Sequence, residues 1–173
     1  ASYGFSHAFL QQVAYGRLLR AERQALHARA AQWYAGLKTA RAADYLTVAA
    51  DHFEQAAQPL EAARYSLLAA QDLAQRFAHD AVVRQARRVL ALAAPEDTAA
   101  RWRALLLSQR ALRLSGQRDA QAQDLDALLA LADASANPVW QATVALRRTV
   151  AADETGQRQQ AAALAPLAMA AVK

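Results

Sequence analysis

The sequence Ser115-Gly116-Gln117-Arg118 is nearly repeated as Thr155-Gly156-Gln157-Arg158, 40 residues further along the chain. In both places a small polar residue and a glycine follow a long run of helix-forming residues, as expected where a helix ends. Helix pairs that recur at this spacing are typical of an α-solenoid, in which each pair covers the apolar face of the next. A compact helical bundle with short loops is the alternative that the spacing leaves open.

The composition of the 173 residues favours helices throughout. Apolar residues make up 55%, and there are only five glycines and four prolines, too few for an all-β chain with many tight turns. Alanine, leucine, glutamine, arginine and glutamate are strong helix formers. Together with the 40-residue spacing, this composition predicts an all-α fold, an α-α superhelix of helical repeats with about eight or nine antiparallel helices.

The breaks in the pattern divide the chain into nine expected helices. Asp80 is expected to cap the fifth helix, and Pro166 is expected to kink or shorten the ninth. The expected spans are about 6–18, 19–37, 43–57, 60–77, 80–93, 98–114, 119–134, 139–154 and 157–172.

The apolar residues of each span indicate which face packs against a neighbouring helix. In the second span this stripe contains Leu19, Leu26 and Trp33. In the eighth span it contains Val139, Ala142, Leu146 and Val150. These residues are expected on the packed faces of their helices.

The positive charge of the chain is concentrated at one end. The net charge is +5; residues 1–41 contain six basic side chains and one acidic side chain, and residues 42–173 contain 14 of each. We therefore separate a basic helical hairpin, 1–41, expected to lead in from an upstream module, from one continuous domain of helical repeats, 42–173. Such a basic end is typical of nucleic-acid binding, of an acidic partner, of a merely solvated helix face or of a surface that contacts a neighbouring domain of a longer protein.

Several function classes lack the residues that they need. The chain has no cysteine, which excludes disulfides and thiolate metal sites and fits a reducing, cytoplasmic location. It has no run of about 18 apolar residues and no secretion signal. His7 and His27 could face each other across the first hairpin, but Glu22 is the only acid nearby, so we expect no metal site. No nucleophile, base and orienting group occur together, so we expect no enzyme activity and no cofactor.

The first half of the chain contains a recognisable pattern of residues. It consists of Tyr3-x-Phe5-x-His7 with Val13-Ala14-Tyr15-x-x-Leu18-Leu19, of Arg23-x-x-Leu26-His27-x-x-x-Ala31, and of His52-x-Glu54-Gln55-Ala56-x-x-Pro59-x-x-Ala62-Ala63-Arg64-Tyr65. This pattern resembles the tetratricopeptide-like (TPR-like) helical region of large bacterial signalling proteins. These are the STAND-type ATPase regulators, including MalT-like transcriptional activators, and the class III adenylate or guanylate cyclases with an attached AAA-type ATPase.

The resemblance implies a TPR-like region that follows nucleotide-binding and winged-helix modules in its parent. It is incomplete, because Val82 and Ala86 replace the alanine and the aromatic residue of the tetratricopeptide pattern. The later helix pairs also run longer than the standard 34-residue repeat. The chain contains no phosphate-binding G-x-x-x-x-G-K-[ST] loop, so any ATPase or cyclase chemistry would lie elsewhere in such a parent.

Three hypotheses for the function follow. The first is an interaction domain that binds a protein, a peptide, another domain of its parent or an effector, with groove residues expected at Tyr45, His52, Arg64 and Arg84. The second is nucleic-acid binding through the basic patch of Arg17, Arg20, Arg23 and Arg29. The third is self-association into a homodimer. The remaining arginine clusters, Arg84 with Arg87-Arg88 and Arg147-Arg148, are expected to be offset by acids on neighbouring helices.

Overall fold

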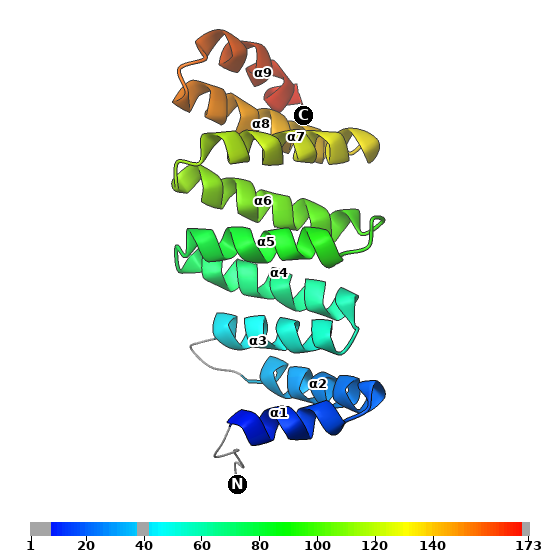
Figure 1. Ribbon diagram of the computed structural model, residues 1–173. Coiled ribbons are helices and arrows are strands. Elements are labelled where there is room, and N and C mark those ends of the chain that lie inside the picture. The colour runs from blue at the N-terminus through cyan, green and yellow to red at the C-terminus, as the bar shows by residue number, and fades with distance from the viewer. Residues whose placement is uncertain (1–7, 38–41, 171–173) are drawn as a thin grey trace.

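The computed structural model describes residues 8–37 and 42–170, and in these ranges the chain forms nine helices and no strand. The helices form a single elongated stack, with the two chain ends at opposite ends of it (Figure 1). From α2 onward, each helix packs on the next one as an antiparallel neighbour. None of the described helices is both long and apolar enough to cross a bilayer. The helices are α1 (Ala8–Arg17), α2 (Arg20–Ala35), α3 (Ala42–Gln55), α4 (Pro59–Gln75), α5 (His79–Leu92), α6 (Thr98–Leu114), α7 (Arg118–Ala134), α8 (Pro138–Glu154) and α9 (Arg158–Ala170).

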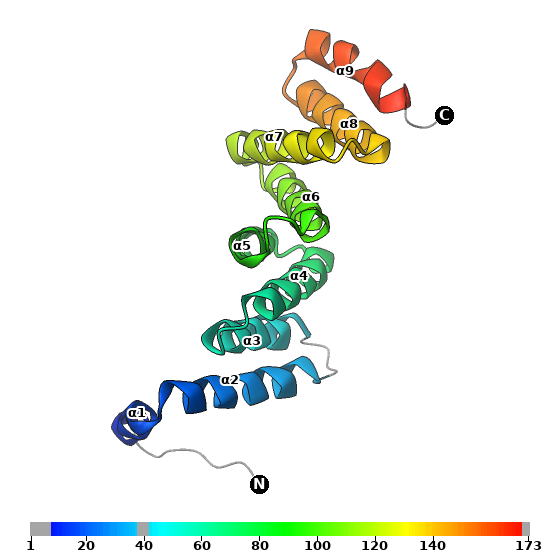
Figure 2. The same cartoon turned by 90° about the vertical axis from the view of Figure 1, so that its right-hand side faces the viewer.

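Successive helices alternate between two sides of the stack, so the stack has two layers. In the turned view α5 lies on one side and α4 and α6 lie on the other (Figure 2), and α4 packs directly on α6. Side-chain hydrogen bonds such as Glu54–Arg88 and Arg87–Asp124 join every second helix, and their partners are 34 and 37 residues apart. This separation is close to one helix pair, so equivalent helices of successive pairs lie side by side. The predicted helical-repeat solenoid is confirmed, and the compact bundle is excluded.

Five of the turns that connect the described helices contain a residue in the left-handed region of the backbone. These residues are 20 positions apart from 57 to 77 and again from 116 to 156, whereas the turn between α5 and α6 contains none. In four of these five turns the following N–H bonds to a carbonyl five residues earlier, as in the Schellman motif that ends helices. The left-handed residues are Ala57, Phe77, Gly116, Ala136 and Gly156, with φ angles of 57, 57, 73, 48 and 77°.

Substitutions at these turns are expected to change stability through the backbone alone. A Cβ atom added at Gly116 meets no atom within 4 Å, so the only cost of Gly116→Ala is the left-handed backbone conformation that the alanine must adopt. We expect Gly116→Ala to lower the free energy of unfolding by about 1 kcal/mol and Ala136→Gly to raise it by somewhat less. Urea unfolding of both variants measures this. Equal stability of Gly116→Ala and the parent protein would contradict the interpretation.

Three local predictions differ from the structure. The N-cap of α5 is Ala78, not Asp80, which lies in the first turn, where its charge interacts favourably with the helix dipole. Pro166 lies inside α9, which continues through it to Ala170, so of the two predicted effects of this proline the shortening is wrong. Phe77, expected as the last residue of the fourth helix, lies in the turn after α4, and 72% of its side chain is exposed.

The packed face of α2 is also different from the predicted stripe. Leu19 and Trp33 are 70% and 62% exposed, whereas Ala31 is fully buried against α3. Positions 31 and 33 are about 200° apart around a helix, so they cannot face the same neighbour. Alanine rather than the larger apolar residues forms this contact because it lets the two helices approach closely.

In α8, too, the buried face differs from the predicted apolar stripe, and the candidate site described below lies beside this helix. Val144 is fully buried with Trp102 and Leu128 in the cluster that joins α6, α7 and α8. The predicted stripe faces elsewhere, and Val139 and Leu146 are 64% and 56% exposed. Since α8 has apolar residues on two sides, its periodicity alone does not identify which side is buried.

Candidate functional site

Two of the predicted partner-binding residues are engaged inside the stack. Tyr45 and His52 of α3 both stack on Tyr34 of α2, with ring centroids 6.1 and 5.6 Å apart. Both side chains are half-buried. Their rings therefore help to join α2 to α3.

The other two predicted partner-binding residues lie on different helices and are exposed. Arg64 of α4 bonds to Glu61 at 3.4 Å and places its guanidinium group 5.6 Å from the ring centre of Tyr65. Arg84 of α5 forms no ion pair within the described part of the chain. No described contact joins either arginine to the aromatic residues of α3, so the structure does not gather the four residues into one site. Their role in binding stays a prediction.

A chain of hydrogen bonds joins α1, α2 and α3 through two histidines. His27 Nε2 lies 2.9 Å from the Tyr15 hydroxyl, and His27 Nδ1 lies 2.8 Å from His52 Nδ1. Burial, and secondly the nearby His52, lower the pKa of His27 below its ordinary value. The contact between two Nδ1 atoms requires one donor and one acceptor, so it forms only while at least one ring is neutral. Within the described residues, no three potential ligands come together as a metal site, and His7 lies outside those residues.

The histidine contact makes the stack sensitive to acid. Because the pKa of His27 is lower in the folded protein than in the unfolded chain, the unfolded chain takes up the proton first as pH falls. The stabilisation is complete above the unfolded pKa of about 6.5 and is lost as pH falls from there towards the folded pKa. We expect the parent protein to lose more stability than His27→Gln between pH 7.5 and 5.5, measured by urea unfolding. An equal loss in both proteins would contradict this prediction.

The four arginines of the predicted basic patch do not share one helix face. Arg17 ends α1, and Arg20, Arg23 and Arg29 belong to α2. Arg20 and Arg29 are nine positions apart, about two and a half turns, so they lie on opposite sides of α2. Arg23 lies over the ring of Tyr15, with its guanidinium carbon 5.3 Å from the ring centre. The patch is therefore dispersed.

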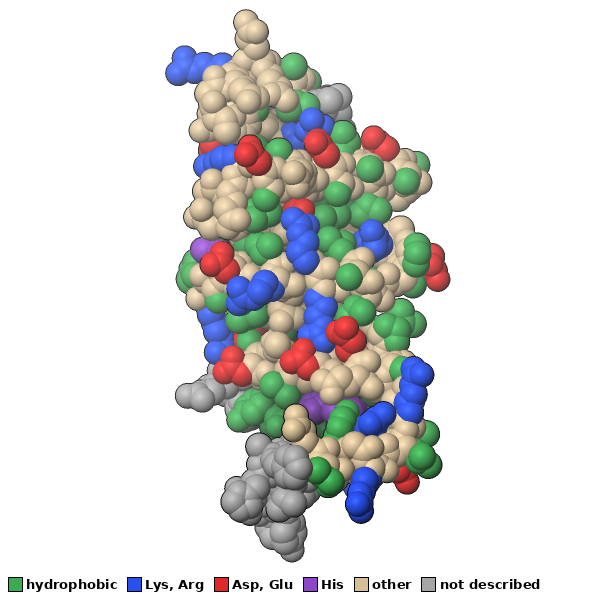
Figure 3. Space-filling view, viewed as in Figure 1, with side chains coloured by type: hydrophobic (Ala, Val, Ile, Leu, Met, Phe, Trp, Pro, Cys, Tyr) green, Lys and Arg blue, Asp and Glu red, His purple; other side chains and the backbone are tan. Residues whose placement is uncertain are grey.

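Three of the five arginines that were predicted to be offset lie near acids of neighbouring helices, whereas the prediction is wrong for Arg84, which has no acidic partner within the described residues. Arg88 of α5 pairs with Asp51 and with Glu54 of α3. Arg87 donates to Asp124 of α7 at 2.5 Å. Arg148 lies 3.7 Å from Asp126. Figure 3 shows basic and acidic side chains interspersed along this face of the molecule.

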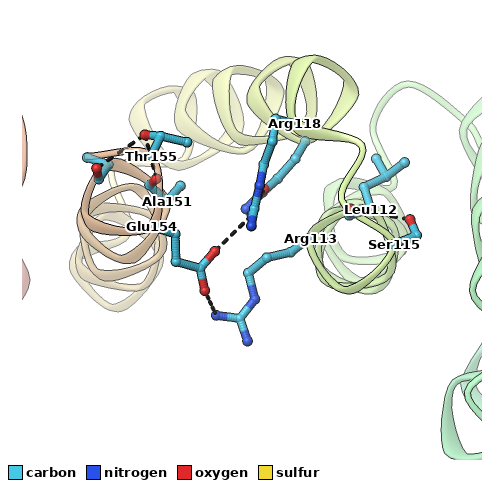
Figure 4. A network of polar contacts seen from close by, with 9 residues as sticks. Leu112, Arg113, Ser115, Arg118, Ala151, Glu154 and Thr155 are labelled. Carbon is cyan, nitrogen blue, oxygen red and sulfur yellow. Dashed lines mark hydrogen bonds and ion pairs between the residues drawn. The ribbon is translucent and has the colours of Figure 1, made fainter. Parts of the chain in front are cut away.

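Several arginines lie together in a groove between α6 and α8, two helices that run in parallel. At their first turns the rings of Trp102 and Trp140 stack with centroids 4.3 Å apart. At the other end of the groove, Glu154 of α8 accepts hydrogen bonds from Arg113 of α6 at 3.0 Å and from Arg118, the first residue of α7, at 2.8 Å (Figure 4). Between these two contacts lies a cavity of about 410 Å³. Its lining residues are Gln109, Arg110, Arg113, Thr143, Leu146, Arg147 and Val150.

Three guanidinium groups share this groove with little neutralising charge. Arg147 is half-buried, and burial, followed by the charges of Arg110 and Arg113, lowers its pKa. Gln109 is only 2% exposed. With its side-chain amide oxygen directed towards α8, Gln109 accepts a hydrogen bond from Arg147 Nη1 at 2.6 Å. Glu154 reaches Arg113 but not the other two. Within the described part of the chain, neither Arg110 nor Arg147 has a carboxylate partner, which corrects the expectation that Arg147 is offset by a neighbouring acid.

A second cavity, of about 280 Å³ among α7, α8 and α9, is electrostatically balanced. Arg118 and Arg148 line it together with Asp119 and Asp126. The arginine groove between α6 and α8 is therefore the stronger candidate site for a charged ligand.

Sequence reasoning missed the arginine groove, although a signal for it was present. Gln109 and Arg147 are 38 positions apart and Arg113 and Glu154 are 41 apart, both close to the 40-residue repeat. Residues one repeat apart lie side by side in a solenoid. Comparing polar residues at this spacing would have placed Arg147 beside α6.

No protein-family profile matches the chain, and neither a curated protein nor a solved structure is significantly similar to it. The function is therefore argued from the geometry and charge of the described residues.

Proposed function

We propose that this chain is a non-catalytic, TPR-like interaction domain that binds a protein or peptide partner through the arginine groove between α6 and α8. The observation that supports this proposal is the excess positive charge of Arg110 and Arg147, on a stack whose other long contacts pair arginines with acids. A half-buried cation without a carboxylate is costly in a folded protein. An acidic partner that supplies the missing charge would gain affinity from it.

The sequence resemblance supports a regulatory setting for this binding. Helical repeats in STAND-type regulators and ATPase-linked cyclases stand next to nucleotide-binding modules. By this resemblance, the domain receives a partner that controls an ATPase, transcription or cyclase module of the same bacterial parent protein.

Selection of displayed random peptides on the immobilised chain tests the proposed function. We expect enrichment of peptides that contain acidic residues, and fluorescence anisotropy should show that they bind at one site. Arg110→Glu should abolish this binding, because it reverses an exposed charge in the arginine groove. Arg103→Glu is the matched control, because Arg103 is an exposed arginine of α6 outside the groove lining, and it should leave the binding unchanged. No enrichment over an unrelated helical protein, or equal loss in both variants, would overturn the proposal.

Nucleic-acid binding through the N-terminal arginines is the second candidate, and the dispersal of these arginines around α2 argues against it. Contacts to a phosphate backbone need basic side chains on a common surface and produce a steep dependence on salt. Retention on a DNA column at low salt, abolished by replacing Arg20 and Arg23 with glutamine, would favour this candidate over peptide binding.

An exposed apolar stripe on α2 and its N-cap supports self-association as a further candidate. Leu19, Leu26 and Trp33 are spaced by seven residues on α2 and are 70%, 47% and 62% exposed. This spacing forms an apolar stripe suited to another helix. Concentration-dependent sedimentation that disappears in Leu26→Lys would favour a homodimer, and a monomer at all concentrations would exclude it.

A further inference from the structure

We propose that the arginine groove between α6 and α8 binds the phosphate group of a phosphorylated serine or threonine on the partner. This inference rests on the proposed function, because it specifies the chemistry of the partner. It is carried by the charge of the groove, by the fixed position of one arginine and by the apolar residues beside them.

The charge of the groove matches a dianion. Arg110 and Arg147 contribute two positive charges without a carboxylate partner among the described residues. The third arginine, Arg113, is already paired with Glu154. A phosphate monoester carries about −1.5 to −2 charges at neutral pH, whereas a glutamate or aspartate side chain carries only one. A phosphorylated side chain would therefore neutralise both arginines at once.

The geometry holds part of the site in place before the ligand arrives. The bond to Gln109, itself almost fully buried, fixes the guanidinium group of Arg147 at the wall of the groove. Arg110 follows Gln109 directly on α6 and is exposed, so it can close over a ligand from the other side. The planar fork of a guanidinium group presents paired N–H donors that fit the oxygens of a phosphate.

The apolar part of the lining indicates what surrounds the phosphate on the partner. Leu146 and Val150 of α8 lie one turn apart in the same groove as the arginines. The cavity of about 410 Å³ has the size of a site for one small group or a few side chains. We therefore expect apolar residues next to the phosphorylated one.

Fluorescence anisotropy with short labelled peptides tests this inference. The first peptide contains phosphoserine between two leucines, the second contains serine at that position, and the third contains glutamate. We expect the phosphopeptide to bind at least tenfold more tightly than the other two. Arg147→Gln and Arg110→Gln should each weaken it at least tenfold. Arg103→Gln, an exposed arginine of α6 outside the groove lining, should not change the affinity.

Each other outcome overturns the inference in a recognisable way. Equal binding of the glutamate peptide would indicate a carboxylate site. Free O-phosphoserine that competes as strongly as the phosphopeptide would indicate a small-molecule site. Equal loss in Arg103→Gln would indicate attraction by overall charge. If displayed peptides bind at one site and lose that binding in Arg110→Glu but phosphorylation adds no affinity, the proposed function stands and only this inference fails.

Discussion

Replacing Leu128 by alanine is expected to lower the free energy of unfolding by about 3–5 kcal/mol, because it opens a cavity in a fully buried cluster. Leu128 of α7 has no exposed surface and packs with Trp102 of α6 and Val144 of α8. The cluster joins three consecutive helices, and a solenoid is held together by such contacts between neighbouring repeats. Urea unfolding measures the loss.

The matched control for this substitution is Leu60→Ala on α4. Leu60 is 61% exposed, so its truncation removes little buried surface and should cost less than about 1 kcal/mol. Hydrogen exchange should also become faster in α7, α8 and α9 of Leu128→Ala than in α3 and α4. Similar costs for the two variants, or uniform changes in exchange, would show that the cluster does not join the repeats as described.

Removing Arg87 is expected to destabilise the protein by about 2–3 kcal/mol, since it leaves a buried carboxylate without its cation. The side chain of Asp124 is 3% exposed; its Oδ1 accepts from Arg87, and its Oδ2 has no hydrogen-bond partner in the described structure. Arg87 itself is 43% exposed, so the expected cost is smaller than for a fully buried pair. Arg87→Met should therefore unfold at clearly lower urea concentration than the parent protein.

A double-variant cycle separates the cost of leaving the buried Asp124 without its cation from the cost of losing the contact itself. Arg87→Met combined with Asp124→Leu should recover most of the stability, because an apolar pair of similar size needs no charge compensation. Arg64→Met is the exposed control; its partner Glu61 is 42% exposed, and the expected cost is below about 1 kcal/mol. The interpretation would be wrong if Arg87→Met cost no more than Arg64→Met, or if the double variant were the least stable.

The site was less predictable than the helices because it depends on which residues of different repeats become neighbours. The sequence indicated that Arg147 belongs to an arginine pair on α8. It did not indicate that Arg148 lies near Asp126 while Arg147 faces Arg110 and Arg113. These two adjacent side chains point to different neighbours, and only the position of α8 beside α6 and α7 assigns a neighbour to each.

The sequence by itself determined the helices, their order and their stacking, since turn residues such as Gly116 and Gly156 act locally and recur once per helix pair. The tertiary structure decided which face of each helix is buried, as Ala31 and Val144 show where larger apolar residues were expected. The physical reason is that alanine-rich helices offer close contact on several faces at similar cost. The choice among those faces, and with it the arginine groove, is made by the neighbouring repeats.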